Sequence, residues 1–187
     1  VGLIIRNNEL YNNPHELIAI GSNDIIIEYN EIYNGVLESA DMGAIYLGRD
    51  PSILGIEIRY NYFHDIGNTY GGIGQQSIFS DDGNVVPYIH SNIFYRGSTT
   101  TEMSGLPSNS FPIKAHGSQF GLIENNIIID SPAAAMFQPW TTNHKDMVQD
   151  TWWLWVYDAT NHGHAIWDKI TRTVDMFGDL YKETYGN

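Results

Sequence analysis

Residues 27–34, "IEYNEIYN", decide the fold, because four other segments of the chain repeat their pattern. Each copy has an aliphatic residue, two variable residues, an Asn and then a mostly apolar run. The other copies are "IRNNELYN" at 5–12, "IRYNYFHD" at 58–65, "IHSNIFYR" at 89–96 and "IENNIIID" at 123–130. The shared Asn residues are Asn8, Asn30, Asn61, Asn92 and Asn126. A recurring unit of about this size indicates a repeat architecture.

The repeated unit has the pattern of short β-strands. β-branched and aromatic residues alternate with polar ones, which is the period of a strand. A second set of apolar runs follows the first: "IAIGSN" at 18–23, "IYLGRD" at 45–50, "SIFSDD" at 77–82 and "IKAHGS" at 113–118. Short parallel strands stacked in coils of this length predict an all-β fold, a parallel β-helix over residues 1–140, with the right-handed sense of parallel crossovers. The Asn column is then a ladder in which each amide bonds its neighbours above and below.

Three segments carry a resemblance to a known superfamily. "NEIYN", "NYFHDIG" and "ENNIIID" resemble the right-handed parallel β-helix repeat of polysaccharide lyases, pectinases, several glycoside hydrolases and phage tailspikes. The series "GAIYLGRD", "IEIRYNYFHDIG", "SIFSDDG" and "NIFYRGS" is similar to bacterial β-helix glycosidases related to the α-fucosidase and xylanase type. That resemblance implies hydrolysis by acidic residues on neighbouring coils. A fold alone does not define a reaction.

The composition excludes several classes of partner. The chain has 187 residues, a net charge of −13 and no cysteine. A phosphate backbone would be repelled by this charge, and no run is long and apolar enough to span a bilayer, so we expect neither nucleic acid nor membrane as a partner. The same charge suits a soluble, exported protein or a cation binder. Together with the resemblance, it leads us to expect a secreted or periplasmic protein that acts on a polysaccharide or oligosaccharide. Because Val1 opens inside a repeat, we read the sequence as a piece of a longer chain.

Residues 141–187 differ in character from the repeats. "TWWLWVYD" at 151–158 is dense in aromatic residues, and the following stretch has helical spacing at Ile166, Ile170, Val174 and Phe177. This pattern predicts an excursion with a helix that packs on the coil stack and covers an open sheet edge. Alternatively, an uncovered edge would let two copies of the stack associate end to end.

The loops locate a candidate cleft. The distance from the ladder Asn to the second strand grows along the chain, from 10 residues after Asn8 to 21 after Asn92. Solenoids collect insertions around their binding face. The cleft is therefore expected on the face of the second strands, walled by residues 35–42, 67–75 and 97–110.

Stacking the second strands predicts the residues of this cleft. Aligning Ile18, Ile45, Ser77 and Ile113 in one inward column directs the alternate residues outward. The outward cluster then comprises Tyr46, Arg49, Asp50, Asp81, Asp82, Lys114 and His116.

The cluster suits hydrolysis of a glycosidic bond. Neighbouring strands lie about 4.8 Å apart, close to the spacing of about 5–5.5 Å between the two carboxylates of a retaining glycosidase. We predict Asp50 and Asp82 as the pair, with Asp81 exchanging with Asp82 if the register differs by one residue. Arg49, Lys114, His116 and Tyr46 would bind the sugar.

Other readings of the same residues remain open. A polysaccharide lyase would use Lys114 or His116 as base, with Arg49 or calcium neutralising a uronate. A non-catalytic adhesin, fibre or tailspike would leave the cluster as solvated surface. We expect no resident cofactor, with calcium as the alternative that Asp50, Asp81 and Asp82 would suit. His64 and Asp65 are expected to make bend contacts away from the cleft. His90 is interpreted as an edge residue, and no Ser-His-Asp order or zinc signature appears.

Overall fold

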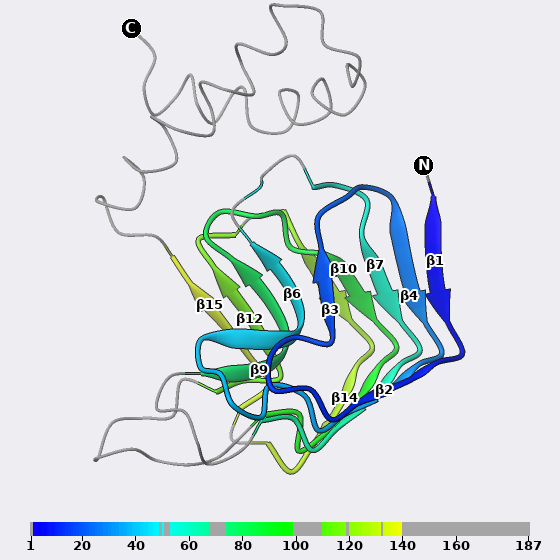
Figure 1. Cartoon of the computed structure of the whole chain (residues 1–187). Helices are drawn as coiled ribbons and strands as arrows, with labels where there is room; N and C mark the ends of the chain where they lie inside the picture. Colours follow the sequence, from blue (N-terminus) through cyan, green and yellow to red (C-terminus); the bar gives the residue numbers. More distant parts are fainter. Residues whose placement is uncertain are drawn as a thin grey trace, which may run out of the picture.

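The fold is a parallel β-helix of three five-stranded sheets (Figure 1). The computed structural model describes residues 2–48, 50, 53–67, 74–98, 110–118, 120–131 and 133–139. Within these ranges every named element is a strand, and no helix that could cross a membrane is present. In Figure 1 the colours run in order from blue at β1 to yellow at β15 along the stack. The predicted all-β solenoid is confirmed, and its right-handed sense stays a prediction.

The first sheet, sheet A, contains the start of every repeated segment. Its strands, in spatial order, are β1 (Leu3–Arg6), β4 (Ile25–Glu28), β7 (Glu57–Arg59), β10 (Tyr88–His90) and β13 (Leu122–Glu124). The aliphatic residue of each repeat falls in one register column: Ile5, Ile27, Ile58, Ile89 and Ile123. The three central members of this column are fully buried. The repeat therefore gives the correct register for this sheet.

The second sheet, sheet B, follows a bend at the ladder Asn. Its strands are β2 (Glu9–Tyr11), β5 (Glu31–Tyr33), β8 (Tyr62–His64), β11 (Ile93–Tyr95) and β14 (Ile127–Ile129). The middle residue of each strand points into the coil, and Phe63 and Phe94 stack there with ring centroids 4.8 Å apart. His64 lies on the other side of this sheet, where it contacts Asp65 at 2.9 Å and Glu31 at 3.2 Å.

Both bends around sheet B use left-handed backbone. The residues before the ladder Asn have φ between 54° and 57°: Asn7, Tyr29, Tyr60, Ser91 and Asn125. The residues after sheet B have φ between 46° and 56°: Asn12, Asn34, Asp65, Arg96 and Asp130. Such conformations are unfavourable for residues other than glycine, so the bend needs compensating bonds.

The Asn ladder supplies those bonds. Nδ2 of Asn8, Asn30, Asn61 and Asn92 donates to Oδ1 of the next ladder Asn, each at 3.0 Å. The same Oδ1 atoms accept backbone N–H groups at 3.0 Å. The predicted ladder is confirmed.

The third sheet, sheet C, is formed by the second strands, on whose face the sequence predicts a cleft. Its strands are β3 (Ile18–Ile20), β6 (Met42–Gly48), β9 (Gln75–Asp81), β12 (Ile113–His116) and β15 (Ala135–Gln138). The predicted inward column was wrong by one residue in the third coil, because Ile78 and not Ser77 pairs with both Ile45 and Ile113. Ile78 is fully buried in the core beside these two isoleucines. Burial of the aliphatic side chain sets the register, since a slip of one residue would turn it to the other face.

The loop at 35–42 is held against sheet C. Nε2 of Gln75 donates to the carbonyls of Val36 and Ser39, both at 2.8 Å. Most of the other two predicted walls, at 67–75 and 97–110, lies outside the described residues, as does the whole predicted excursion at 141–187.

Candidate functional site

The outward face of sheet C contains two columns of side chains. Tyr46, Phe79 and Lys114 form the first column. Gly48 is opposite Asp81, and His116 follows as the last residue of β12. The structure therefore brings Tyr46, Asp81, Lys114 and His116 to one face, as predicted. The corrected register makes Asp81 the outward strand residue and puts Asp82 in the following turn.

Asp81 is the centre of the polar contacts. Its Oδ2 accepts a hydrogen bond from the Tyr46 hydroxyl at 3.0 Å, and its Oδ1 lies 3.0 Å from Nδ1 of His116. Only 6% of Asp81 is exposed. Burial and then the charge of Asp82 raise the pKa of the Asp81 carboxyl above its ordinary value, against the opposing effect of the bonds from His116 and Tyr46. The surroundings therefore disfavour the ionised form of Asp81 relative to a free carboxyl group.

His116 links both carboxylates of the turn. Its Nδ1 is 3.0 Å from Asp81 Oδ1 and 3.3 Å from Asp82 Oδ1. Because an ionised carboxylate only accepts hydrogen bonds, Nδ1 carries the proton when either carboxylate is charged. One ligand atom from each of these three residues lies within 4.8 Å of the other two, so the group could hold a metal ion. A set that includes an imidazole suits a transition metal better than calcium, which takes oxygen ligands.

Gly48 makes room for the contact between Tyr46 and Asp81. A Cβ added at Gly48 would overlap the Tyr46 ring and hydroxyl. The backbone of Gly48 is not in the left-handed region, so the residue is required for space and not for its conformation. The Tyr46 side chain thus crosses Gly48 to reach the next coil.

Lys114 lies beside this cluster as a buried cation. Its Nζ is 3.5 Å from Asp41 Oδ1 and 4.6 Å from the centroid of the Phe79 ring. Only 5% of Lys114 is exposed, whereas the side chain of Asp41 is 58% exposed. Asp41, at the end of the loop at 35–42 that was predicted to wall the cleft, therefore forms an ion pair with Lys114.

The other two predicted site residues lie differently. Arg49 is outside the described residues. Asp50 is half-buried, and its carbonyl accepts the backbone N–H of Ile53 at 3.2 Å. The pairing of β6 with β9 ends at Gly48 opposite Asp81, one residue away from the alignment that set Asp50 opposite Asp82. The alignment behind the predicted Asp50–Asp82 pair was therefore wrong by one residue.

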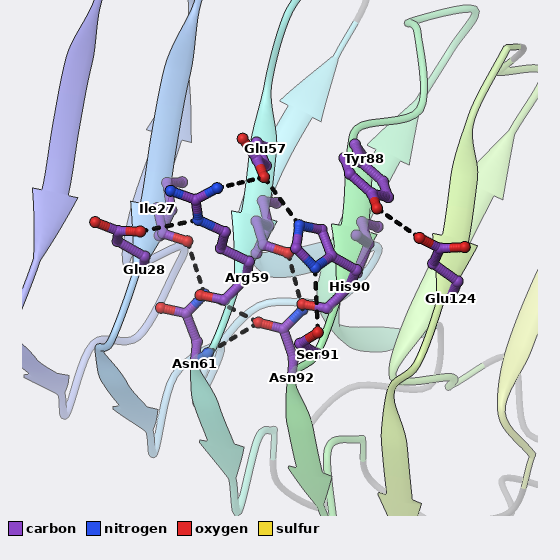
Figure 2. A network of polar contacts seen from close by, with 12 residues as sticks. Ile27, Glu28, Glu57, Arg59, Asn61, Tyr88, His90, Ser91, Asn92 and Glu124 are labelled. Atoms are coloured by element: carbon purple, nitrogen blue, oxygen red, sulfur yellow. Dashed lines mark hydrogen bonds and ion pairs between the residues drawn. The ribbon is translucent and has the colours of Figure 1, made fainter.

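Sheet A contains a second polar network, which the sequence did not single out (Figure 2). Arg59 Nε donates to Glu28 Oε2 at 2.9 Å, and its Nη1 donates to Glu57 Oε1 at 2.7 Å. Nε2 of His90 lies 2.9 Å from the same Glu57 oxygen. Burial alone would raise the pKa of the Glu57 carboxyl, but hydrogen bonds from His90 and Arg59 outweigh it and hold the pKa below its ordinary value.

His90 is not an edge residue, since β10 pairs with β7 on one side and with β13 on the other. The network could have been found from the sequence, because its row consists of the residues that directly follow the aligned isoleucines. This outward row is rich in charged residues: Arg6, Glu28, Arg59, His90 and Glu124.

Comparison with known proteins assigns no relative to the chain. No family model, no curated protein and no solved structure matches it. The resemblance to β-helix glycosidases therefore stays a hypothesis, and a function has to be inferred from the geometry of the site.

Proposed function

We propose that the outward face of sheet C is the active site of a glycoside hydrolase that acts on a polysaccharide or oligosaccharide. The observation that carries the proposal is the carboxylate pair, Asp81 and Asp82, joined by His116 and with the pKa of Asp81 raised. Glycosidases need one carboxyl group that holds a proton and one that is ionised. Asp81 supports the first role, and the more exposed Asp82 supports the second.

In this proposal Asp81 is the general acid that protonates the leaving oxygen. Asp82 attacks the anomeric carbon, and water then releases the sugar while Asp81 acts as base. His116 holds both carboxylates, and Tyr46 fixes the orientation of Asp81 through Oδ2. One oxygen of Asp81 and one oxygen of Asp82 lie within 4.8 Å of each other, which is compatible with the closely spaced carboxyl groups of a retaining enzyme. Retention of the anomeric configuration is therefore expected.

Lys114 and His116 are less suited to the base of a lyase. The Nζ of Lys114 contacts Asp41 and the face of the Phe79 ring, so it is directed at protein groups. His116 directs Nδ1 at the carboxylates of Asp81 and Asp82, so this nitrogen is likewise directed at protein groups. Hydrolysis is the reaction that these contacts support better than proton abstraction.

The test compares aspartate variants on a panel of neutral and acidic polysaccharides. Asp81→Asn and Asp82→Asn are expected to lower reducing-end release by about 10²–10⁴-fold, the usual contribution of a general acid or base. Asp130→Asn is the matched control, because the same bend column holds Asn12 and Asn34 in other coils. Asp50→Asn tests the remaining predicted carboxylate, and circular dichroism verifies that each variant is folded.

Three outcomes would reject the proposal. An unsaturated product that absorbs in the ultraviolet would identify a lyase. Equal activity in Asp81→Asn, Asp82→Asn and wild type would place the reaction elsewhere. Absence of any turnover by the folded chain on the whole panel would favour a structural protein such as an adhesin or fibre.

A further inference from the structure

A second group of reactive side chains lies on the outward side of sheet A, at the end of β10 (Figure 2). The Ser91 Oγ is 3.2 Å from Nδ1 of His90, and Nε2 of the same ring is 2.9 Å from Glu57 Oε1. A hydroxyl, an imidazole and a carboxylate thus follow one another within hydrogen-bond reach. This is the geometric relation of a nucleophile, its base and the group that orients the base.

The carboxylate fixes the tautomer of the imidazole. Arg59 Nη1 bonds Glu57 Oε1 at 2.7 Å, and Glu28 Oε2 in turn holds Arg59 at 2.9 Å. Glu57 is therefore held ionised, in agreement with its lowered pKa. An ionised carboxylate accepts the Nε2–H of His90, which leaves the lone pair of Nδ1 facing the Ser91 hydroxyl. The ring is further held by Tyr88, whose ring stacks on it at 4.2 Å.

The bond from Ser91 is not a requirement of the fold. Ser91 occupies the left-handed bend position, with φ 56°, which other coils fill with Asn7, Tyr29, Tyr60 and Asn125. The ladder bonds at this coil come from the neighbouring Asn92. Ser91 is also only half-buried, whereas His90 is 8% exposed. The bend thus presents an accessible hydroxyl on a buried, oriented imidazole.

From this geometry we propose that Ser91 is a nucleophile that takes the acyl group of a carboxylic ester. The Ser91 Oγ forms a bond to the carbonyl carbon, its proton moves to Nδ1 of His90, and the bond to the alkoxy group breaks as that proton passes to the leaving oxygen. Water then attacks the acyl group through the same imidazole, which releases the carboxylic acid and restores the Ser91 hydroxyl. This activity is separate from that of sheet C and does not rest on the proposed hydrolase.

The surroundings favour a small, uncharged ester. The Tyr60 ring packs edge-on against His90 at 5.7 Å and is 45% exposed, so an exposed aromatic surface adjoins the imidazole. Glu124 is the register partner of His90 on the next coil, and the whole chain has a net charge of −13. An anionic ester would be repelled at this place. An acetyl ester of a neutral alcohol is the simplest substrate of this class.

The experiment uses p-nitrophenyl acetate and the full chain. We expect a burst of about one nitrophenolate per chain, with the acetyl group located on Ser91 by peptide mass spectrometry. Ser91→Asn removes the hydroxyl but keeps a residue that Asn7 and Asn125 show to fit this bend. It is expected to lower the acylation rate by about 10²-fold or more, the lower bound for base-assisted attack. His90→Gln, which lacks the base, is expected to lower it similarly.

The control is Ser39→Ala, because the Ser39 hydroxyl donates to the Pro14 carbonyl and not to an imidazole. This variant should acylate at the wild-type rate. A fluorophosphonate probe gives an independent readout and should label wild type but not folded Ser91→Asn. The proposal fails if the acetyl group is found on His90 or spread over several residues, or if Ser91→Asn and wild type react at the same rate.

Discussion

Replacing Asn61 by Ala tests the central physical claim about the fold, that the Asn ladder stabilises the left-handed bends. Asn61 is 2% exposed and makes five side-chain hydrogen bonds. Its Oδ1 accepts the backbone N–H and Nδ2 of Asn30, both at 3.0 Å. Its Nδ2 donates to the carbonyls of Ile27 and Arg59, both at 2.9 Å, and to Oδ1 of Asn92 at 3.0 Å.

The expected loss of stability follows from the buried polar groups that lose a hydrogen-bond partner in Asn61→Ala. The buried backbone N–H of Asn30 and the buried carbonyl of Ile27 both lose these bonds in Asn61→Ala. A buried polar group without a partner costs about 1–3 kcal/mol, so the two together should lower the free energy of unfolding by about 2–6 kcal/mol. That is a large share of the roughly 5–15 kcal/mol that stabilises a domain.

Asn8→Ala is the matched control at the first described rung of the ladder. Asn8 is exposed, and its Nδ2 donates to the Arg6 carbonyl and to Asn30 Oδ1. The backbone N–H of Asn8 also donates to Asn30 Oδ1, at 3.0 Å, and this bond should persist in Asn8→Ala. Loss of exposed hydrogen bonds should lower the free energy of unfolding by only about 1 kcal/mol.

The assay is urea unfolding followed by far-ultraviolet circular dichroism, together with hydrogen exchange at the Asn30 amide. Asn61→Ala should accelerate exchange at that amide, because the amide loses its acceptor. The reasoning is refuted if the two variants unfold with free energies within about 1 kcal/mol of each other, or if the Asn30 amide keeps its protection in Asn61→Ala.

Three further predictions concern the charged groups. Gly48→Ala should displace the Tyr46 ring, break its bond to Asp81 and raise the pKa of Asp81 further, as measured by carboxyl titration in NMR; an unchanged titration would contradict the steric argument. Because the pKa of Asp81 is raised in the folded state, its ionisation opposes folding as the pH rises above the unfolded value of about 3.9. The melting temperature of Asp81→Asn relative to wild type should therefore increase from pH 4 to pH 7, and a constant difference would argue against it. The pKa of Glu57 is lowered, so its contribution to stability is present above the unfolded value of about 4.3 and is lost as the pH falls through the folded pKa. Glu57→Gln should consequently melt below wild type at pH 7 and approach it in acid; a gap of equal size at both pH values would show that Arg59 and the carboxylate do not act through charge.

The sequence predicts sheets A and B well and sheet C less well, for a physical reason. In the first two sheets the ladder Asn anchors each copy, and the bends on both sides allow no insertion between Ile58, Asn61 and Phe63 or their equivalents. Sheet C follows loops of different length, so no marker fixes where its strands begin. The error of one residue arose because Ser77 was placed beside Ile45, although burial of the aliphatic Ile78 was the better criterion.

The side-chain contacts on which the two proposals rest could not be predicted from the strand register alone. Asp81 and Tyr46 do not share a register row, since Tyr46 is opposite Phe79 and Asp81 is opposite Gly48. The contact runs diagonally, and it exists because Gly48 leaves space for the tyrosine ring. Glu57 and His90 are likewise diagonal neighbours on β7 and β10. Side-chain direction across a sheet, which depends on the neighbours, decides both contacts.

The two outward faces hold carboxylates with opposite electrostatic character, which argues for different chemical roles. On sheet A, bonds from His90 and Arg59 overcome the effect of burial, so Glu57 stays an anion that can orient an imidazole. On sheet C, burial and the charge of Asp82 prevail over the bonds from His116 and Tyr46, so the pKa of the Asp81 carboxyl is raised. A permanent anion suits the orientation of a base, and a carboxyl with a raised pKa suits proton donation. The same solenoid thus holds a carboxyl group with a lowered pKa on sheet A and one with a raised pKa on sheet C, because the neighbouring side chains on the two faces differ.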